Sequence, residues 1–192
     1  MYWLYSLGLG ASLVAGLPVF AIQALLRGKY RRGLGERLGR APVWTGPVPP
    51  VWLHAVSVGE VMAATPLARE LTARRPDLPL LVSTVTDTGR GVAEARLPAK
   101  QFLFFPLDLG WAVRTALDRV RPRAVLLTET EIWPNFLRAC SARGIPVVLV
   151  NGRISPRSFP RYRRVRGVFG RVLQGIQLFC MQTPEDAQRI LD

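Results

Sequence analysis

Short apolar runs alternate with segments of helical spacing along most of the chain. Six of these runs have the length and composition of strands, at 51–56, 79–85, 101–106, 124–129, 146–151 and 178–181. Each is followed by a segment with helical spacing, and these segments begin near Gly59, Thr88, Gly110, Ile132, Arg161 and Pro184. Strands that are apolar on both faces and alternate with helices are typical of a covered parallel sheet. The pattern therefore predicts an α/β fold with helices on both faces of a parallel sheet.

The N-terminal pattern is different, because residues 1–26 carry no charge and a basic segment follows them. A run of about 20 apolar residues is long enough to span a bilayer as a helix. Tyr2, Trp3 and Tyr5 could lie at one membrane interface, and the basic segment would then stay on the cytoplasmic side. We expect a spanning helix here. A helix that lies in one leaflet, kinked at Pro18, is the alternative.

These patterns divide the chain into three parts. Residues 1–26 would form a membrane anchor, residues 27–50 a basic juxtamembrane segment and a Pro/Gly-rich linker, and residues 51–192 the α/β domain. The chain has 192 residues and is 49% hydrophobic, which suffices for one domain with a substantial core.

The net charge of +13 comes almost entirely from arginine, since lysine occurs only at Lys29 and Lys100. Arginine favours bidentate contact with phosphate or carboxylate groups. The charge alone would also suit nucleic acid. The predicted anchor, the absence of a nucleic-acid motif and the acids at strand ends argue against that class of partner.

Metal and thiol chemistry have little support in the sequence. His54 is the only histidine and lies within a strand pattern, which leaves neither a zinc motif nor the histidine of a Ser-His-Asp triad. Cys140 and Cys180 stand in apolar surroundings, and we expect both to be buried, reduced thiols. We therefore expect no metal and no cofactor.

The carboxyl ends of parallel strands form the sites of open α/β sheets, so the residues that follow each strand are candidates. The first strand leads into Ser57, Gly59 and Glu60. An ionised glutamate in this place could act as a general base. Spacing alone favours the alternative of a capping box, in which Ser57 caps the helix and Glu60 is the return partner.

The second and third strand ends offer weaker candidates. The stretch "STVTDTGR" could bind an anion through the backbone N–H groups near Gly89, or it could simply cap a helix with Asp87 or Thr88. Asp108 is most simply the N-cap of the helix that follows it.

The fourth strand ends in two acids, Glu129 and Glu131, and these are the strongest signal in the chain. Half-buried acids cost free energy unless they are paired, so two at one strand end indicate a function. The fifth strand places Asn151, Arg153 and Ser155 near the same edge, where Arg153 could pair with Glu131 or bind a substrate anion.

A basic segment follows the fifth strand and reads as one amphipathic helix. Its apolar positions are Val165, Val168, Phe169, Val172 and Leu173, and its arginines are at 163, 164, 166 and 171. Such a helix usually packs on the core with a solvated basic face. Beside a membrane anchor, attraction to anionic lipid is the alternative.

Three separated motifs, "HAVSVGE", "ETEIWPN" and "NGRIS", and the upstream "YRRGLGERLG" resemble the Kdo (3-deoxy-D-manno-octulosonic acid) transferases of lipopolysaccharide biosynthesis. That resemblance implies a GT-B glycosyltransferase with two Rossmann-like domains. This chain would be the N-terminal domain, which holds the lipid A precursor. The missing C-terminal domain would bind the donor CMP-Kdo, so the chain alone is expected to be inactive.

The resemblance also assigns roles. Glu60 matches the catalytic base for inverting transfer, and one of Glu129 and Glu131, with Glu129 favoured, matches a residue that stabilises the transition state. The acceptor would contact Ser57, Gly59, Asn151, Arg153 and Ser155. The enzyme would work on the cytoplasmic face of the inner membrane, among anionic lipids. A non-catalytic, membrane-associated module that binds anionic lipid remains the alternative.

Overall fold

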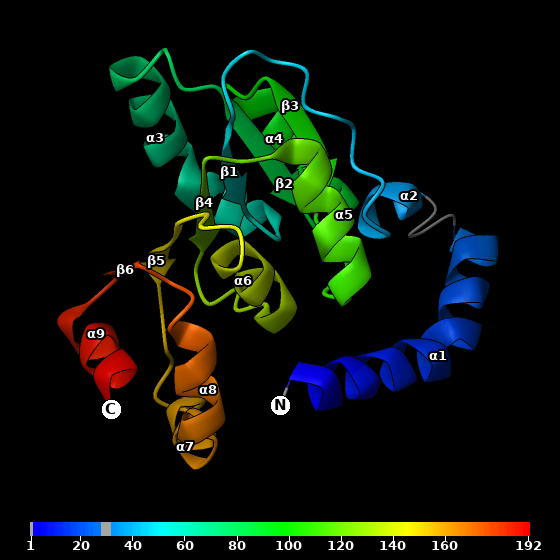
Figure 1. Ribbon diagram of the computed structural model, residues 1–192, viewed down its shortest axis with the longest axis vertical. Helices are drawn as coiled ribbons and strands as arrows, with labels where there is room; N and C mark the ends of the chain where they lie inside the picture. The colour runs from blue at the N-terminus through cyan, green and yellow to red at the C-terminus, as the bar shows by residue number, and fades with distance from the viewer. Residues whose placement is uncertain (1, 28–31) are drawn as a thin grey trace.

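A six-stranded parallel sheet forms the centre of the molecule, which we describe from a computed structural model over residues 2–27 and 32–192 (Figure 1). The strand order is β3-β2-β1-β4-β5-β6. The bounds are β1 Val51–His54, β2 Leu80–Thr84, β3 Gln101–Phe104, β4 Ala124–Thr128, β5 Val147–Gly152 and β6 Leu178–Met181. Each strand falls on one of the six apolar runs, with β5 ending one residue beyond its run, and the predicted parallel α/β sheet is confirmed.

Helices cover both faces of the sheet and divide the core in two. Alternate strand residues point to opposite faces, so Trp52 packs with α5 and α6 whereas Leu53 packs with α3 and α4. The helix bounds are α3 Val58–Arg74, α4 Asp87–Arg96, α5 Gly110–Val120, α6 Pro134–Ser141, α7 Phe159–Arg164, α8 Arg166–Leu173 and α9 Pro184–Leu191. In this three-layered arrangement, the turns that lead from each strand into the next helix lie together along the carboxyl edge of the sheet.

The order of the strands reverses direction between β1 and β4, which are direct neighbours in the sheet. Their register pairs His54 with Leu127, so the residues after both strands emerge side by side. In doubly wound sheets this reversal opens a crevice in which ligands bind. The segments that carry Glu60 and Glu129 therefore meet at the place where a site is expected.

The β6 side of the sheet differs from the sequence prediction in two respects. The basic segment is not one helix, because the chain breaks at Val165 (φ −113°, ψ 18°) between α7 and α8. That break leaves Val165 exposed rather than on an apolar helix face. The prediction that Cys180 is buried is wrong, whereas Cys140 is buried as expected. Cys180 lies on β6, at the edge of the described sheet, on the same exposed face as Leu178.

The N-terminal apolar run forms one helix, α1 Tyr2–Arg27, which extends away from the sheet (Figure 1). Across residues 2–27 and 32–192, no helix has both the length and the apolar character needed to cross a membrane. The predicted membrane-spanning anchor is therefore not supported. Residues 28–31 of the predicted basic juxtamembrane segment lie outside the described residues.

The "GLGERLG" part of the motif forms the short helix α2, Leu34–Arg37, which docks on the end of β3. The Glu36 carboxylate accepts a hydrogen bond from the backbone N–H of Phe104 at 2.5 Å. The Arg37 guanidinium lies 4.4 Å from the centre of the Phe104 ring and donates to the Val85 carbonyl at 2.6 Å. This segment therefore fixes the turn after β2, on one flank of the crevice.

Candidate functional site

Glu60 lies in the first turn of α3, and its side chain is held rather than free. The residue is 7% exposed. Its Oε2 accepts hydrogen bonds from the Val56 N–H at 2.9 Å and the Thr128 hydroxyl at 3.0 Å, and its Oε1 accepts one from the Ser57 hydroxyl at 3.0 Å. A carboxylate oxygen can accept about two hydrogen bonds. Within the described part of the chain, Oε1 therefore retains acceptor capacity for an incoming hydroxyl.

The capping box that spacing favoured does not form. Ser57 is the N-cap of α3, but its hydroxyl accepts no capping hydrogen bond. It donates to Glu60 instead, and the second oxygen of Glu60 bonds to Val56 rather than returning to Ser57. The hydrogen bonds therefore position the carboxylate and do little for the helix end.

Thr128, the last residue of β4, joins the two strand ends, and the sequence reasoning did not weigh it. Its hydroxyl lies 3.0 Å from Glu60 Oε2 and 2.9 Å from the His54 carbonyl oxygen. One hydroxyl has one hydrogen, so it can donate to only one of these oxygens at a time. The available signal was a polar residue at the end of an otherwise apolar strand, directly before the two acids.

Glu129 and Glu131 lie in the turn after β4, beside Glu60, and we call these three residues the acid cluster. Burial raises the pKa of Glu131 to about 7, and the charges of Glu60 and Glu129 add to the shift. The nearby Trp133 indole N–H opposes this rise in pKa. The pKa of Glu129 is also raised, by burial and then by Glu60, while Arg153 lowers it. The three acids thus lie close enough to repel one another.

The backbone helps to place Glu129, which has φ 55° and donates its N–H to the Val150 carbonyl at 2.9 Å. Asn151 on β5 also has φ 55°. Positive φ is uncommon outside glycine, and asparagine adopts it more readily than most residues, so Glu129 is the more unusual of the two.

The predicted acceptor-binding residues fall into two groups. Ser57 contacts Glu60 directly, and Arg153 is close enough to lower the pKa of Glu129. Ser155 instead bonds to Ser158, with 2.8 Å between the hydroxyls, at the start of α7. Gly59 is exposed in the first turn of α3, where a Cβ would come no closer than 3.9 Å to the Ser57 hydroxyl.

His54 is fully buried one residue before the turn, as its strand pattern indicated. Burial lowers its pKa to about 3, so the imidazole is neutral. Its Nδ1 lies 2.9 Å from the Ser83 hydroxyl, and its ring stacks on Phe105 with 3.8 Å between centroids. The His54 side chain therefore belongs to the core. Only its backbone carbonyl contacts the site, where it accepts a hydrogen bond from the Thr128 hydroxyl.

Two of the weaker candidates have structural roles, though with different partners from those expected. Thr86, not Asp87 or Thr88, caps α4 by accepting the Gly89 N–H at 3.0 Å. Asp108 does not cap its own helix. It accepts the N–H groups of Asn135 at 3.0 Å and Phe136 at 2.8 Å, which begin α6. Burial raises the Asp108 pKa to about 6 against these hydrogen bonds.

Comparison with known proteins places this arrangement in a family. The model of a family described as 3-deoxy-D-manno-octulosonic-acid transferase (kdotransferase) matches residues 32–192. The chain belongs to the Kdo transferase family. The earlier resemblance, drawn from three short motifs, is thereby confirmed over most of the chain.

Two similar curated proteins are both named 3-deoxy-D-manno-octulosonic acid transferase. The one from Haemophilus influenzae is 36% identical over 156 residues, which are 80% of this chain and 36% of the relative. The one from Bordetella pertussis is 39% identical over 172 residues, which are 85% of this chain and 40% of the relative. The chain thus spans less than half the length of the Kdo transferases that it matches.

Proposed function

We propose that this chain is the acceptor-binding half of an inverting GT-B Kdo transferase of lipopolysaccharide biosynthesis. The acceptor would be a lipid A precursor and the donor CMP-Kdo, bound mainly by a C-terminal domain. The observation that carries the proposal is the acid cluster at the reversal of strand order, where Glu60 from the β1 side meets Glu129 and Glu131 from the β4 side. Family membership supports the reaction class.

Glu60 is the general base in this proposal. Three hydrogen bonds fix its carboxylate, and Oε1 keeps the capacity to accept a hydroxyl of the acceptor sugar. As the acceptor oxygen bonds to the anomeric carbon of Kdo, its proton moves to Glu60, and the bond from that carbon to the phosphate oxygen of CMP breaks. CMP leaves with the bonding electrons, and the attack from the opposite side inverts the configuration. A positioned base of this kind contributes roughly 100- to 10,000-fold to rate.

Glu129 and Glu131 supply negative charge where the transition state develops positive charge on the sugar ring. Their raised pKa values show that the described surroundings compensate these charges poorly. A passing oxocarbenium charge would relieve the same repulsion, so the stabilisation is larger in the transition state than in the resting site. Arg153, close to Glu129, would contact a phosphate of the acceptor or of the donor.

The same proposal places the domain at the cytoplasmic face of the inner membrane. Helix α1 exposes large apolar side chains, among them Trp3 at 64% and Val14 at 66%. Apolar side chains that a helix leaves exposed to solvent are suited to contact with a membrane surface. We infer that α1 lies in the interfacial region among anionic lipids, from which the lipid A precursor reaches the crevice.

The test is Glu60→Ala in the full-length enzyme, assayed for Kdo transfer from CMP-Kdo to a lipid A precursor. We expect a loss of roughly 100- to 10,000-fold, because the base contributes that much. Glu70→Ala is the matched control, since Glu70 lies on the same helix and forms only an exposed ion pair with Arg74. A Glu60→Ala enzyme that keeps its circular dichroism spectrum and transfers at the normal rate would refute the base assignment.

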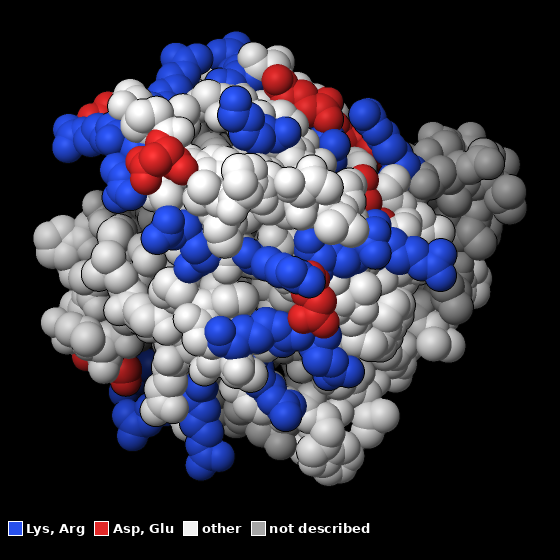
Figure 2. Space-filling model, turned by 45° about the horizontal axis from the view of Figure 1, so that its top comes forward, with Lys and Arg blue, Asp and Glu red and all other residues white. Residues whose placement is uncertain are grey.

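The second candidate function is a non-catalytic module that binds anionic lipid. The charge favours it, because 26 Lys and Arg residues outnumber 13 Asp and Glu, and basic side chains are spread over the face in Figure 2. Normal transfer by the Glu60→Ala enzyme would leave this candidate in place, whereas specific loss of transfer would exclude it.

A further inference from the structure

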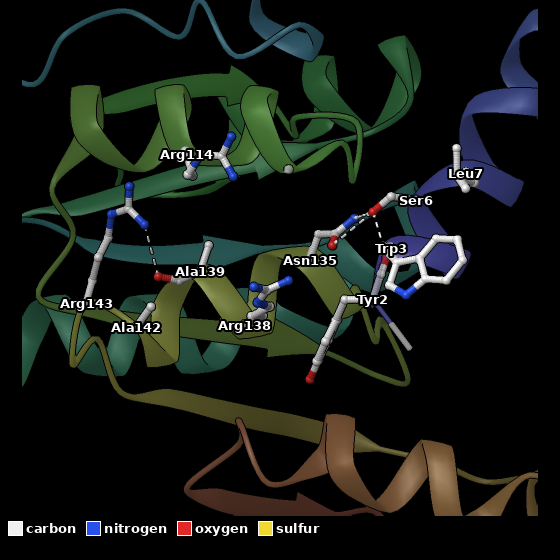
Figure 3. Close-up of a pocket in the computed structure, with 11 residues that line it drawn as sticks. Tyr2, Trp3, Ser6, Leu7, Arg114, Asn135, Arg138, Ala139, Ala142 and Arg143 are labelled. Atoms are coloured by element: carbon white, nitrogen blue, oxygen red, sulfur yellow. Dashed lines mark hydrogen bonds between the residues drawn. The ribbon is translucent and has the colours of Figure 1, made fainter.

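A groove of about 530 Å³ separates the start of α1 from helices α5 and α6 (Figure 3). No residue of the acid cluster lines it. Tyr2, Trp3 and Leu7 of α1 line one part of it, and Arg114 of α5 and Arg138 of α6 line another. Figure 3 shows the two arginines reaching in from their helices and Trp3 standing at the α1 end.

Polar contacts hold α1 in this position. The Asn135 amide of α6 donates to the Ser6 hydroxyl of α1 at 3.0 Å. The Ser6 hydroxyl in turn donates to the Tyr2 carbonyl within α1 at 2.9 Å. The Tyr5 side chain is near enough to Asp108, the residue that caps α6, to lower the pKa of that carboxyl. A side-chain hydrogen bond therefore links the start of α1 to the start of α6 beside the groove.

The charge of the groove has one sign. Arg114, Arg138 and Arg143 line it, and no aspartate or glutamate is among the described lining residues. Arg143 is engaged by Asp118 at 2.7 Å. Within residues 2–27 and 32–192, neither Arg114 nor Arg138 has an acidic side chain in ion-pair distance, and the Arg138 guanidinium lies 5.0 Å from the Tyr2 ring centre. Two guanidinium groups are thus available for an anion.

Apolar side chains adjoin these arginines. Trp3 and Leu7 line the groove and are 64% and 62% exposed, and Leu4 is exposed beside them. An aromatic ring next to cationic groups is the arrangement that suits the headgroup region of a bilayer. A free phosphate ion would use the arginines but would leave these apolar surfaces in water.

We propose that the groove between α1, α5 and α6 binds the phosphate headgroup of an anionic phospholipid, with Arg114 and Arg138 as its ligands. The proposal rests on the membrane association proposed above but is independent of the transfer reaction. Because α6 begins at Pro134, three residues after Glu131, a lipid held here would keep the acid cluster close to the membrane surface.

The experiment measures binding of the chain to phosphatidylcholine vesicles with and without phosphatidylglycerol, by co-sedimentation. We expect the double variant Arg114→Gln, Arg138→Gln to lose roughly 25-fold in affinity for the anionic vesicles, because each basic residue near the surface contributes about fivefold. Binding to pure phosphatidylcholine should not change. The matched control is Arg69→Gln, Arg96→Gln, which removes the same charge from exposed positions on α3 and α4, across the sheet.

Each result decides between specific alternatives. Equal losses in both double variants, with thermal melting unchanged, would show that net charge rather than the groove binds the lipid. Failure of the unmodified chain to bind any anionic vesicle would refute the membrane association itself. Displacement from the vesicles by inorganic phosphate, beyond that by chloride at matched ionic strength, would assign the groove to a soluble anion.

Discussion

The acid cluster and the groove between α1, α5 and α6, which we call the arginine groove, lie on either side of the start of α6. They differ in how their charged side chains are held. In the acid cluster, Glu60 is buried and receives three hydrogen bonds at 2.9–3.0 Å. In the groove, Arg114 and Arg138 stand exposed on helix surfaces. The first arrangement fixes an atom to within a fraction of an ångström, and the second offers charge on long side chains that can adapt to a ligand.

This difference follows from where each charge stands in the fold. The acids come from turns at the ends of neighbouring strands, whose positions the sheet determines. Burial, and then the charges of Glu60 and Glu129, raise the pKa of Glu131 to about 7, so holding the ionised acids in this place costs free energy. The arginines come from helix faces turned to solvent, where an unpaired charge costs little. We therefore interpret the buried acid cluster, which costs free energy to hold, as a catalytic site. We interpret the exposed arginines, which cost little, as a binding site.

The largest expected effect that tests this contrast is that of Glu131→Gln in the full-length enzyme. We expect Kdo transfer to fall roughly 100-fold at pH 8, where Glu131 is ionised, because a charge that stabilises the transition state is lost. Wild-type activity should rise with pH through about 7 as Glu131 ionises, and the variant should lack that rise. The measurement is the pH profile of kcat.

The same variant should be more stable than the wild type at high pH. The pKa of Glu131 in the folded protein is raised above the ordinary 4.5, so the folded state favours the protonated form. The stability that this proton contributes is complete below about pH 4.5 and is lost as pH rises through about 7. Glutamine does not ionise, so the variant should not lose this part of its free energy of unfolding at high pH. If Glu129→Gln abolishes the pH-dependent rise in activity and Glu131→Gln does not, Glu129 rather than Glu131 is the acid whose ionisation limits transfer.

The next effect concerns how firmly Glu60 is held. Thr128→Val removes the hydroxyl that bonds to Glu60 Oε2 while keeping the shape of the side chain. A hydrogen bond to a charged group is worth roughly 1.5–3 kcal/mol, so we expect kcat to fall about tenfold or more with little change in KM. Thr128→Ser is the matched control and should retain most of the activity. An equal loss in both variants would point to packing rather than to the hydrogen bond.

The sequence was sufficient for the sheet and for the place of the acid cluster. Apolar runs of strand length gave all six strands, and the rule that sites form at strand ends selected Glu60, Glu129 and Glu131. It could not supply the order β3-β2-β1-β4-β5-β6, which makes the segments after β1 and β4 neighbours. Only that order brings acids separated by about 70 residues in the chain to one crevice.

Other features depend on partners distant in sequence, and these the sequence pattern could not supply. Asp108 caps α6 rather than its own helix because the fold brings the two turns together. Cys180 is exposed because it shares with Leu178 the face of β6 that the described helices leave uncovered, whereas Phe179 and Met181 on the other face pack against the core. The arginine groove had no local signal at all, because Arg114 and Arg138 on separate helices resemble any solvated arginine until α1 packs beside them.

The smallest expected effect tests whether an additional unpaired arginine in the groove increases its affinity for lipid. Asp118→Asn releases Arg143 from an exposed ion pair with a nitrogen–oxygen distance of 2.7 Å. Such a pair contributes less than about 1 kcal/mol, so the melting temperature should hardly move. Affinity for phosphatidylglycerol vesicles should rise by up to about fivefold, because one more cation faces the lipid. Asp77→Asn is the control, since it breaks the comparable pair with Arg75 outside the groove. An equal gain in the two variants would mean that the vesicles respond to total charge, and the distinction between a binding groove and a basic surface would then fail.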